Sequence, residues 1–231
     1  MSAKPIVVIS FGIAPEQETS FREFYQHRYI PELLKTAPEI SVVRRYEEIC
    51  GLGSQNWYTR LFVTIFELKS EKEIETIDSC FDRPETNELF EGWKAEHLRG
   101  FHQAVYKPRW SHERQPADGT FGNRPFFFWA LELKPHLSDA VTSWYEDDYL
   151  PIHMSDVPSW AACRRYESIG LDAKRFLTFY EAVDEPGLVR CTDEMRSPVR
   201  NSENEIWREK FVPAVAWQYV GSFRQIFRRP G

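Results

Sequence analysis

The sequence lacks the motifs by which several classes of protein bind a metal, a nucleotide or a membrane. Its 231 residues include 4 cysteines and 6 histidines, but these form no CxxC pair and no Cys/His cluster with metal-ligand spacing. It has no GxGxxG motif, no phosphate-binding loop, no GxSxG and no HExxH motif. No apolar stretch approaches the roughly 18 residues of a membrane-spanning helix. We therefore expect no metal, no cofactor and no membrane association.

The sequence also has no excess of positive charge, with 29 Lys and Arg against 35 Asp and Glu. The net charge is −6 and the pI is about 5.6, so we expect no binding to nucleic acid phosphates. The cysteines are scattered and the apolar N-terminal run resembles a strand rather than a signal peptide, so we predict a cytoplasmic protein. With 42% hydrophobic and 28% charged residues, the composition is typical of a globular chain.

Aromatic residues, by contrast, are abundant. The chain has 8 Trp, 10 Tyr and 17 Phe, or 15% aromatic residues. Such a composition is compatible with two different structures. One is a core rich in phenylalanine, and the other is a cavity that encloses a flat apolar ligand.

The second half of the chain repeats motifs of the first half in the same order. Residues 25–31 (YQHRYIP) match residues 145–151 (YEDDYLP), and residues 38–47 (PEISVVRRYE) match residues 158–167 (PSWAACRRYE), both at an offset of 120. Later matches have an offset of 114, namely Phe62/Phe176, Thr64/Thr178, Glu67/Glu181 and Trp93/Trp207. The change of offset predicts six extra residues in the first half, in a loop around 51–58. We interpret the pattern as a tandem duplication.

Each half has the same predicted order of elements: strand, helix, strand, strand, helix, strand. The predicted strands of the first half are 6–11, 41–49, 60–68 and 104–106, with helices 19–29 and 85–98. Those of the second half are 126–133, 161–169, 175–182 and 222–227, with helices 138–149 and 204–217. Pro31 and Pro151 are expected to end or bend the first helix of each half.

The β-α-β-β-α-β order is that of the ferredoxin-like unit. We predict an α+β protein with one unit in residues 1–106, a linker in residues 107–124 that is rich in Pro, Gly and charge, and a second unit in residues 125–231. A ferredoxin-like sheet carries helices on one face only. Two four-stranded sheets are therefore expected to pack face to face, with the helices outside and a barrel-like interior. Dimerisation of the whole chain is possible as well.

These motifs resemble the dimeric α/β-barrel superfamily, and its EthD-like members in particular. The similarity lies in the helix that ends Tyr25-x-x-x-Tyr29-x-Pro31, the following Pro38, and the strand with Arg44 and Tyr46, and it recurs in the second half. The family often has His two residues before the Pro, where this chain has Tyr29 and Tyr149. The resemblance implies a small aromatic or polyketide-like substrate and chemistry that often needs no cofactor. Other members bind haem or have no known activity.

The Arg-Arg-Tyr-Glu strands offer two faces. Arg44 and Tyr46 point to one side and Arg45 and Glu47 to the other, and we favour Arg44 and Tyr46 as the residues that face the interior. On the third strands, the purely apolar face of Val63, Ile65, Leu177 and Phe179 is expected under the helices. The mixed face of Phe62, Thr64, Phe66, Phe176, Thr178 and Tyr180 is expected to line the cavity. The alternative is that the arginines only form structural ion pairs.

Arginine can bind a carboxylate or a phenolate, and Tyr or His can transfer a proton. His153 lies near Asp147, Asp148 and Asp156, which we expect to raise its pKa; the alternative is an exposed histidine at a helix end. The second half is favoured for catalysis, with a shared cavity, and His97 and His102 rank lower. The predicted catalytic residues are Tyr149, His153, Arg164 and Tyr166, and the predicted substrate-binding residues are His27, Tyr29, Arg44 and Tyr46.

Three functions fit these residues. We favour a cofactor-independent lyase, a decarboxylase of a phenolic aromatic acid in the catabolism of aromatic compounds. The ring of such a substrate accepts the electrons that CO₂ leaves behind. The first alternative is a monooxygenase or cyclase that acts on a polyphenolic or polyketide substrate. The second is a non-catalytic barrel that binds an aromatic molecule or haem.

Overall fold

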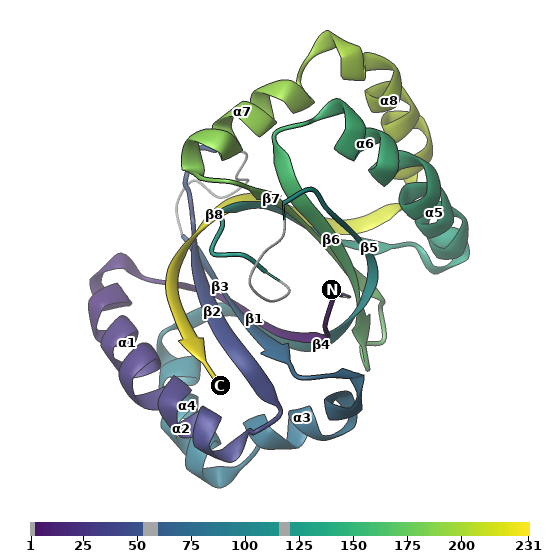
Figure 1. Cartoon of the computed structure of the whole chain (residues 1–231). Coiled ribbons are helices and arrows are strands. Elements are labelled where there is room, and N and C mark those ends of the chain that lie inside the picture. The colour runs from purple at the N-terminus through teal and green to yellow at the C-terminus, as the bar shows by residue number, and fades with distance from the viewer. Residues whose placement is uncertain (1–2, 53–59, 116–120) are drawn as a thin grey trace.

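The strands of this protein close into a single antiparallel barrel. The structure, a computed structural model, describes residues 3–52, 60–115 and 121–231 (Figure 1). In these residues the strand order around the barrel is β1-β3-β2-β8-β5-β7-β6-β4. The strands are β1 (Ile6–Ile13), β2 (Ile40–Glu48), β3 (Leu61–Leu68), β4 (Leu98–Glu113), β5 (Phe126–Leu133), β6 (Trp160–Ile169), β7 (Arg175–Ala182) and β8 (Val215–Pro230).

Helices cover the outside of the barrel in two groups. The first half supplies α1 (Glu18–Phe24), α2 (Ile30–Thr36), α3 (Ile74–Phe81) and α4 (Pro84–Glu96), and the second supplies α5 (Ser138–Trp144), α6 (Leu150–Asp156), α7 (Glu185–Met195) and α8 (Asn201–Ile206). The two groups lie on opposite sides of the barrel (Figure 1). No helix in the described ranges is long and apolar enough to cross a membrane.

The predicted fold class is confirmed: the chain is an α+β protein with a pseudo-dimeric ferredoxin-like barrel. The sheets are not separate, however, because the last strand of each half is long enough to pair with both halves. β4 pairs with β1 and then with β6, while β8 pairs with β5 and β2. The first part of the predicted linker, residues 107–113, therefore belongs to β4. The helices α3 and α7 were not predicted, and most of the extra loop expected around 51–58 lies outside the described residues.

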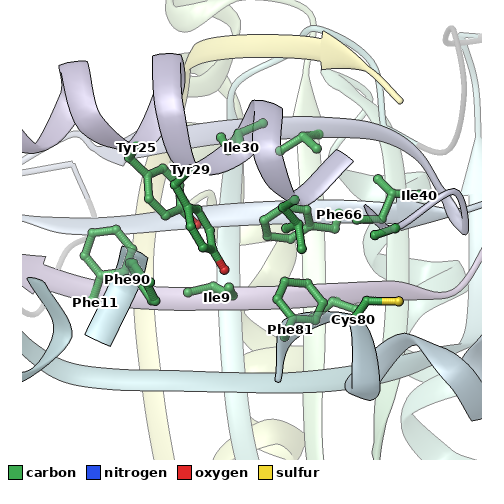
Figure 2. Packing of buried hydrophobic residues seen from close by; sticks show 14 of the residues in the cluster. Ile9, Phe11, Tyr25, Tyr29, Ile30, Ile40, Phe66, Cys80, Phe81 and Phe90 are labelled. Atoms are coloured by element: carbon green, nitrogen blue, oxygen red, sulfur yellow. The ribbon is translucent and has the colours of Figure 1, made fainter. Parts of the chain in front are cut away.

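The expected faces of the third strands are reversed. Val63 and Ile65 belong to the interior cluster with Ile6, Val8 and Tyr46, as do Leu177 and Phe179. The mixed face lies under the helices: Phe62 and Phe66 pack in the helix-covered core of the first half (Figure 2), and Phe176 and Tyr180 pack in that of the second. The large rings of this face fill the space between strands and helices, where aromatic helix residues meet them. The preference for Tyr46 facing the interior agrees with the structure.

Pro31 does not end its helix. The chain stays helical from α1 through a π-helical turn at Tyr25–Tyr29 into α2. In that wide turn the N–H of Ile30 bonds to the carbonyl of Tyr25. Pro31 follows immediately, where the widened turn accommodates a ring that lacks an N–H donor. The second half repeats the arrangement with the turn Tyr145–Tyr149 before Pro151.

Candidate functional site

A cavity of about 370 Å³ opens at one end of the barrel. Its walls include Val8, Phe128 and Leu177, which belong to the cluster of residues that fills the barrel interior. The lining residues come from β1, β3 and β4 of the first half and from β5, β7 and β8 of the second. The cavity is therefore shared between the halves. Its size and largely apolar walls suit a small aromatic molecule.

Two residues of β4 form a hydrogen-bonded pair in this cavity. The Nε2 atom of His102 lies 3.0 Å from the hydroxyl oxygen of Tyr106. Burial, and secondly the positive charge of Arg175, lower the pKa of His102 to about 4. Burial raises the pKa of Tyr106 well above its usual value. Both side chains are therefore uncharged at neutral pH, and the imidazole has one nitrogen that can accept a proton.

Arg175, the first residue of β7, brings a positive charge to the same wall. Its Nε and Nη2 atoms donate to Oε1 of Glu132 at 3.0 and 2.6 Å. Its guanidinium carbon lies 4.4 Å from the centroid of the Trp217 ring. Burial raises the pKa of Tyr106, and the positive charge of Arg175 acts against that rise. The contacts with Glu132 and Trp217 hold the guanidinium in one position.

A second polar pair, Glu48 with Tyr219, lies on the facing wall. The Tyr219 hydroxyl donates to Oε1 of Glu48 at 2.5 Å. Oε2 of the same carboxylate accepts from the backbone N–H of Leu61 at 2.9 Å. Glu48 is only 2% exposed, so these hydrogen bonds compensate for the loss of water around its charge.

Four of the predicted site residues lie in the barrel interior but away from this cavity. Arg44 pairs with Glu67 at 3.2 Å, and Arg164 pairs with both Glu181 and Glu113. The alternative of structural ion pairs therefore describes both arginines. Tyr46 and Tyr166 are fully buried among apolar residues, and burial raises the pKa of each.

The far end of the barrel is filled by the chain itself. The Phe121 ring stacks on Tyr166 at 6.0 Å and lies under the guanidinium of Arg164 at 5.5 Å. The N–H of Gly122 bonds to Glu181 at 3.2 Å. These contacts occupy the space around the interior arginines, whereas His102 lines the cavity described above.

Tyr149 and His153 lie outside the barrel, in the helix-covered core of the second half. Tyr149 accepts a hydrogen bond from Nη2 of Arg200 at 3.2 Å, and Nε2 of His153 accepts one from the Trp160 indole at 3.1 Å. The expected rise of the His153 pKa is wrong. Burial and the charge of Arg200 lower it well below its usual value, because Asp147 and Asp148 are exposed to solvent instead of facing the imidazole.

The remaining predicted binding residues also lie elsewhere. Tyr29 packs between Tyr25 and Phe90 beneath the helices of the first half (Figure 2). His27 lines an open surface groove of about 550 Å³. That groove also carries three carboxylates, Glu32, Glu85 and Glu88, which would repel an anionic substrate. The structure thus does not bring the eight predicted residues together, and their roles remain predictions.

The alternation of residues along β4 could have indicated the cavity, but the predicted start of this strand was too late in the sequence. His102, Ala104 and Tyr106 alternate along β4 and point to the same side. Because we began this strand at residue 104, His102 was ranked low as a candidate. Within the described ranges, no group of three or more His, Cys, Asp or Glu residues is arranged to hold a metal ion.

The architecture is that of a pseudo-dimeric ferredoxin-like barrel, with a cavity to which both halves of the chain contribute. No protein-family model matches the sequence, and no curated protein matches it.

Several solved structures do match the fold of this chain. One is an anthrone oxidase-like protein, with a TM-score of 0.72 and 11% identity over 99% of this chain and 94% of the other. A candidate monooxygenase from Fusobacterium nucleatum has a TM-score of 0.61 and 7% identity, covering 100% and 96% of the chains. A second, from Lactobacillus acidophilus, has a TM-score of 0.52 and 10% identity, covering 98% and 96%. At these identities the likeness establishes the fold alone.

Proposed function

We propose that this protein is an oxygenase that oxidises a phenolic or anthrone-like aromatic compound in the barrel cavity, with no cofactor taking part. The observation that carries the proposal is the uncharged His102–Tyr106 pair inside an apolar cavity. A neutral imidazole in such a place can take a proton from an acidic phenol or from a carbon next to a carbonyl group. Apolar walls favour the flat ring system of such a substrate and exclude water from the resulting anion.

The proposed reaction needs no oxidant other than molecular oxygen. His102 accepts one proton from an activated CH₂ group and leaves an electron-rich aromatic anion. That anion gives up electrons to O₂, and a C–O bond forms to give a hydroperoxide that takes up a proton. Loss of water then yields a carbonyl, so that CH₂ and O₂ become C=O and H₂O. The substrate supplies all the electrons.

The similar structures support an oxygenase over the lyase that the sequence favoured. Three barrels that cover nearly the whole chain carry monooxygenase or anthrone oxidase-like names. We therefore place the oxygenase first.

Incubation of the protein with anthrone tests the proposal, with an oxygen electrode to follow O₂ and mass spectrometry to follow products. One O₂ consumed for each anthraquinone formed, above the rate without protein, is the expected result. The His102→Gln variant should lose this activity. Release of CO₂ from phenolic acids without O₂ uptake would instead indicate the lyase, and a Soret band in the purified protein would indicate a haem-carrying barrel.

We also propose that the two halves are copies of an EthD-like unit, in residues 1–106 and 125–231. The equal order of elements supports this division, as do the ordered matches between residues at offsets of 120 and then 114. Both halves contribute to the cavity, so separate expression of either half should abolish binding of aromatic ligands. A homodimer of the whole chain is a further prediction, which light scattering can test.

A further inference from the structure

The cavity differs between its two walls although the halves share one fold. In the eight-strand order, each strand lies four places from its counterpart, so equivalent residues face each other across the barrel. β5 pairs Glu132 with Arg175, whereas β1 pairs Gly12 with Leu61 at the equivalent place. A charged pair on one wall therefore faces glycine and leucine on the other. Among the lining residues that the structure describes, Arg175 is the only lysine or arginine.

The surroundings of Arg175 prepare it to bind a ligand. Glu132 accepts bonds from Nε and Nη2, and the Trp217 ring packs against the guanidinium. The backbone N–H of Arg175 donates to the Ser168 hydroxyl at 2.8 Å, which fixes the start of β7. Since a guanidinium has five N–H donors, these contacts leave donors for a bound molecule.

The other ionisable groups near the cavity are either paired or uncharged, so the space beside Arg175 suits an anion. The Glu132 carboxylate is paired with Arg175 itself. The Glu48 carboxylate accepts hydrogen bonds from the Tyr219 hydroxyl and the N–H of Leu61. His102 carries no charge at neutral pH. An oxyanion on an aromatic ring would gain a charge-assisted hydrogen bond from Arg175, whereas the neutral form would gain only an ordinary one.

We propose that Arg175 determines specificity by selecting aromatic substrates in their ionised form, with the oxyanion held between Arg175 and the His102–Tyr106 pair. The inference rests on the proposed function for the identity of the cavity as the substrate site. It adds that the substrate carries a phenolate in addition to the carbon that His102 deprotonates, and that a matched neutral ring binds poorly. In turnover, an anion held here would also stabilise the imidazolium that forms when His102 takes up a proton.

Binding of two matched probes tests this. One is 4-nitrophenol, whose phenolate is coloured, and the other is 4-nitroanisole, which has the same ring but cannot ionise. Titrations at several pH values, followed by absorbance and tryptophan fluorescence, give the affinity for each form. We expect the wild-type protein to bind the phenolate at least about tenfold more tightly than the ether, which is about 1.4 kcal/mol. The phenol should also ionise at lower pH on the protein than in water.

The Arg175→Met variant should lose this preference, and Arg175→Lys should keep part of it because a charge remains. Lys174→Met is the matched control: it removes a neighbouring positive charge that is 60% exposed and pairs with Glu167, and it should leave the preference unchanged. Circular dichroism checks that each variant is folded.

A wild-type protein without preference for the phenolate overturns the proposal by itself, whether or not the variants fold. An unchanged preference in folded Arg175→Met does the same. If the preference depends on Arg175 but no ionisable aromatic compound drives O₂ uptake, the anion site stands and the proposed oxygenase function fails.

Discussion

Arg200 donates a hydrogen bond to the hydroxyl of Tyr149, a residue 51 positions earlier, at 3.2 Å. Asp156 and Glu203 also contact the guanidinium, which is 1% exposed. At the first-half position equivalent by the offset of 114, the chain has Thr86, which bonds to backbone carbonyls instead. The polar core under the helices of the second half therefore depends on a cation that the first half does not have.

Arg200→Met should destabilise the protein by about 3 kcal/mol, because the change leaves two partly buried carboxylates without their cation. The free energy of unfolding from urea denaturation measures the effect. Arg196→Met in the same region removes an exposed arginine and should change stability by no more than about 0.5 kcal/mol. Equal effects of the two variants would show that the buried cluster does not stabilise the fold.

The arrangement of strands could be predicted from the sequence, but the orientation of their faces could not. Val63 and Phe62 are both buried, since helices cover one face of β3 and the barrel interior covers the other. The alternation of residues along the strand then defines two faces that are both apolar, and it does not show which of them faces the barrel interior. The cavity was missed for a related reason. His102 lies on a part of β4 that is rich in polar residues, and only the pairing with β1 shows that it is a strand.

His102→Gln and Tyr106→Phe should each lower turnover of an aromatic substrate by roughly 10²-fold or more, the scale for the loss of a group that transfers protons. Tyr149→Phe and His153→Ala should leave the turnover of folded protein near that of the wild type, because both lie outside the cavity. The rate constant kcat at saturating substrate is the measurement. The opposite result would restore the catalytic roles first assigned to the second half.

Tyr46→Phe and Tyr166→Phe should keep stability unchanged or raise it by up to about 1 kcal/mol. Both hydroxyls are buried and make no hydrogen bond in the described structure, so their removal eliminates a desolvation cost without breaking a contact. Thermal unfolding measures the change. A loss of activity with unchanged stability would indicate that Tyr166 acts on the substrate after all.

Stability should fall as the pH is lowered from about 6.5 towards 4. In the unfolded chain His102 takes up a proton near its ordinary pKa of 6.5, whereas in the folded protein its pKa is about 4. Between these values the unfolded state binds more protons, so acidification favours unfolding, and the effect is complete below the folded pKa. His153, whose pKa is lowered still more clearly by burial, acts in the same direction.

Urea denaturation at a series of pH values measures this dependence, and single variants divide it between the two histidines. His102→Gln should reduce the slope between pH 6.5 and 4, and His153→Gln should reduce it further because its imidazole is almost completely buried. His27→Gln is the comparison variant, since His27 lies on the surface. If the slope persists in the double variant without His102 and His153, other groups carry the acid sensitivity, and the uncharged state assigned to His102 loses its support.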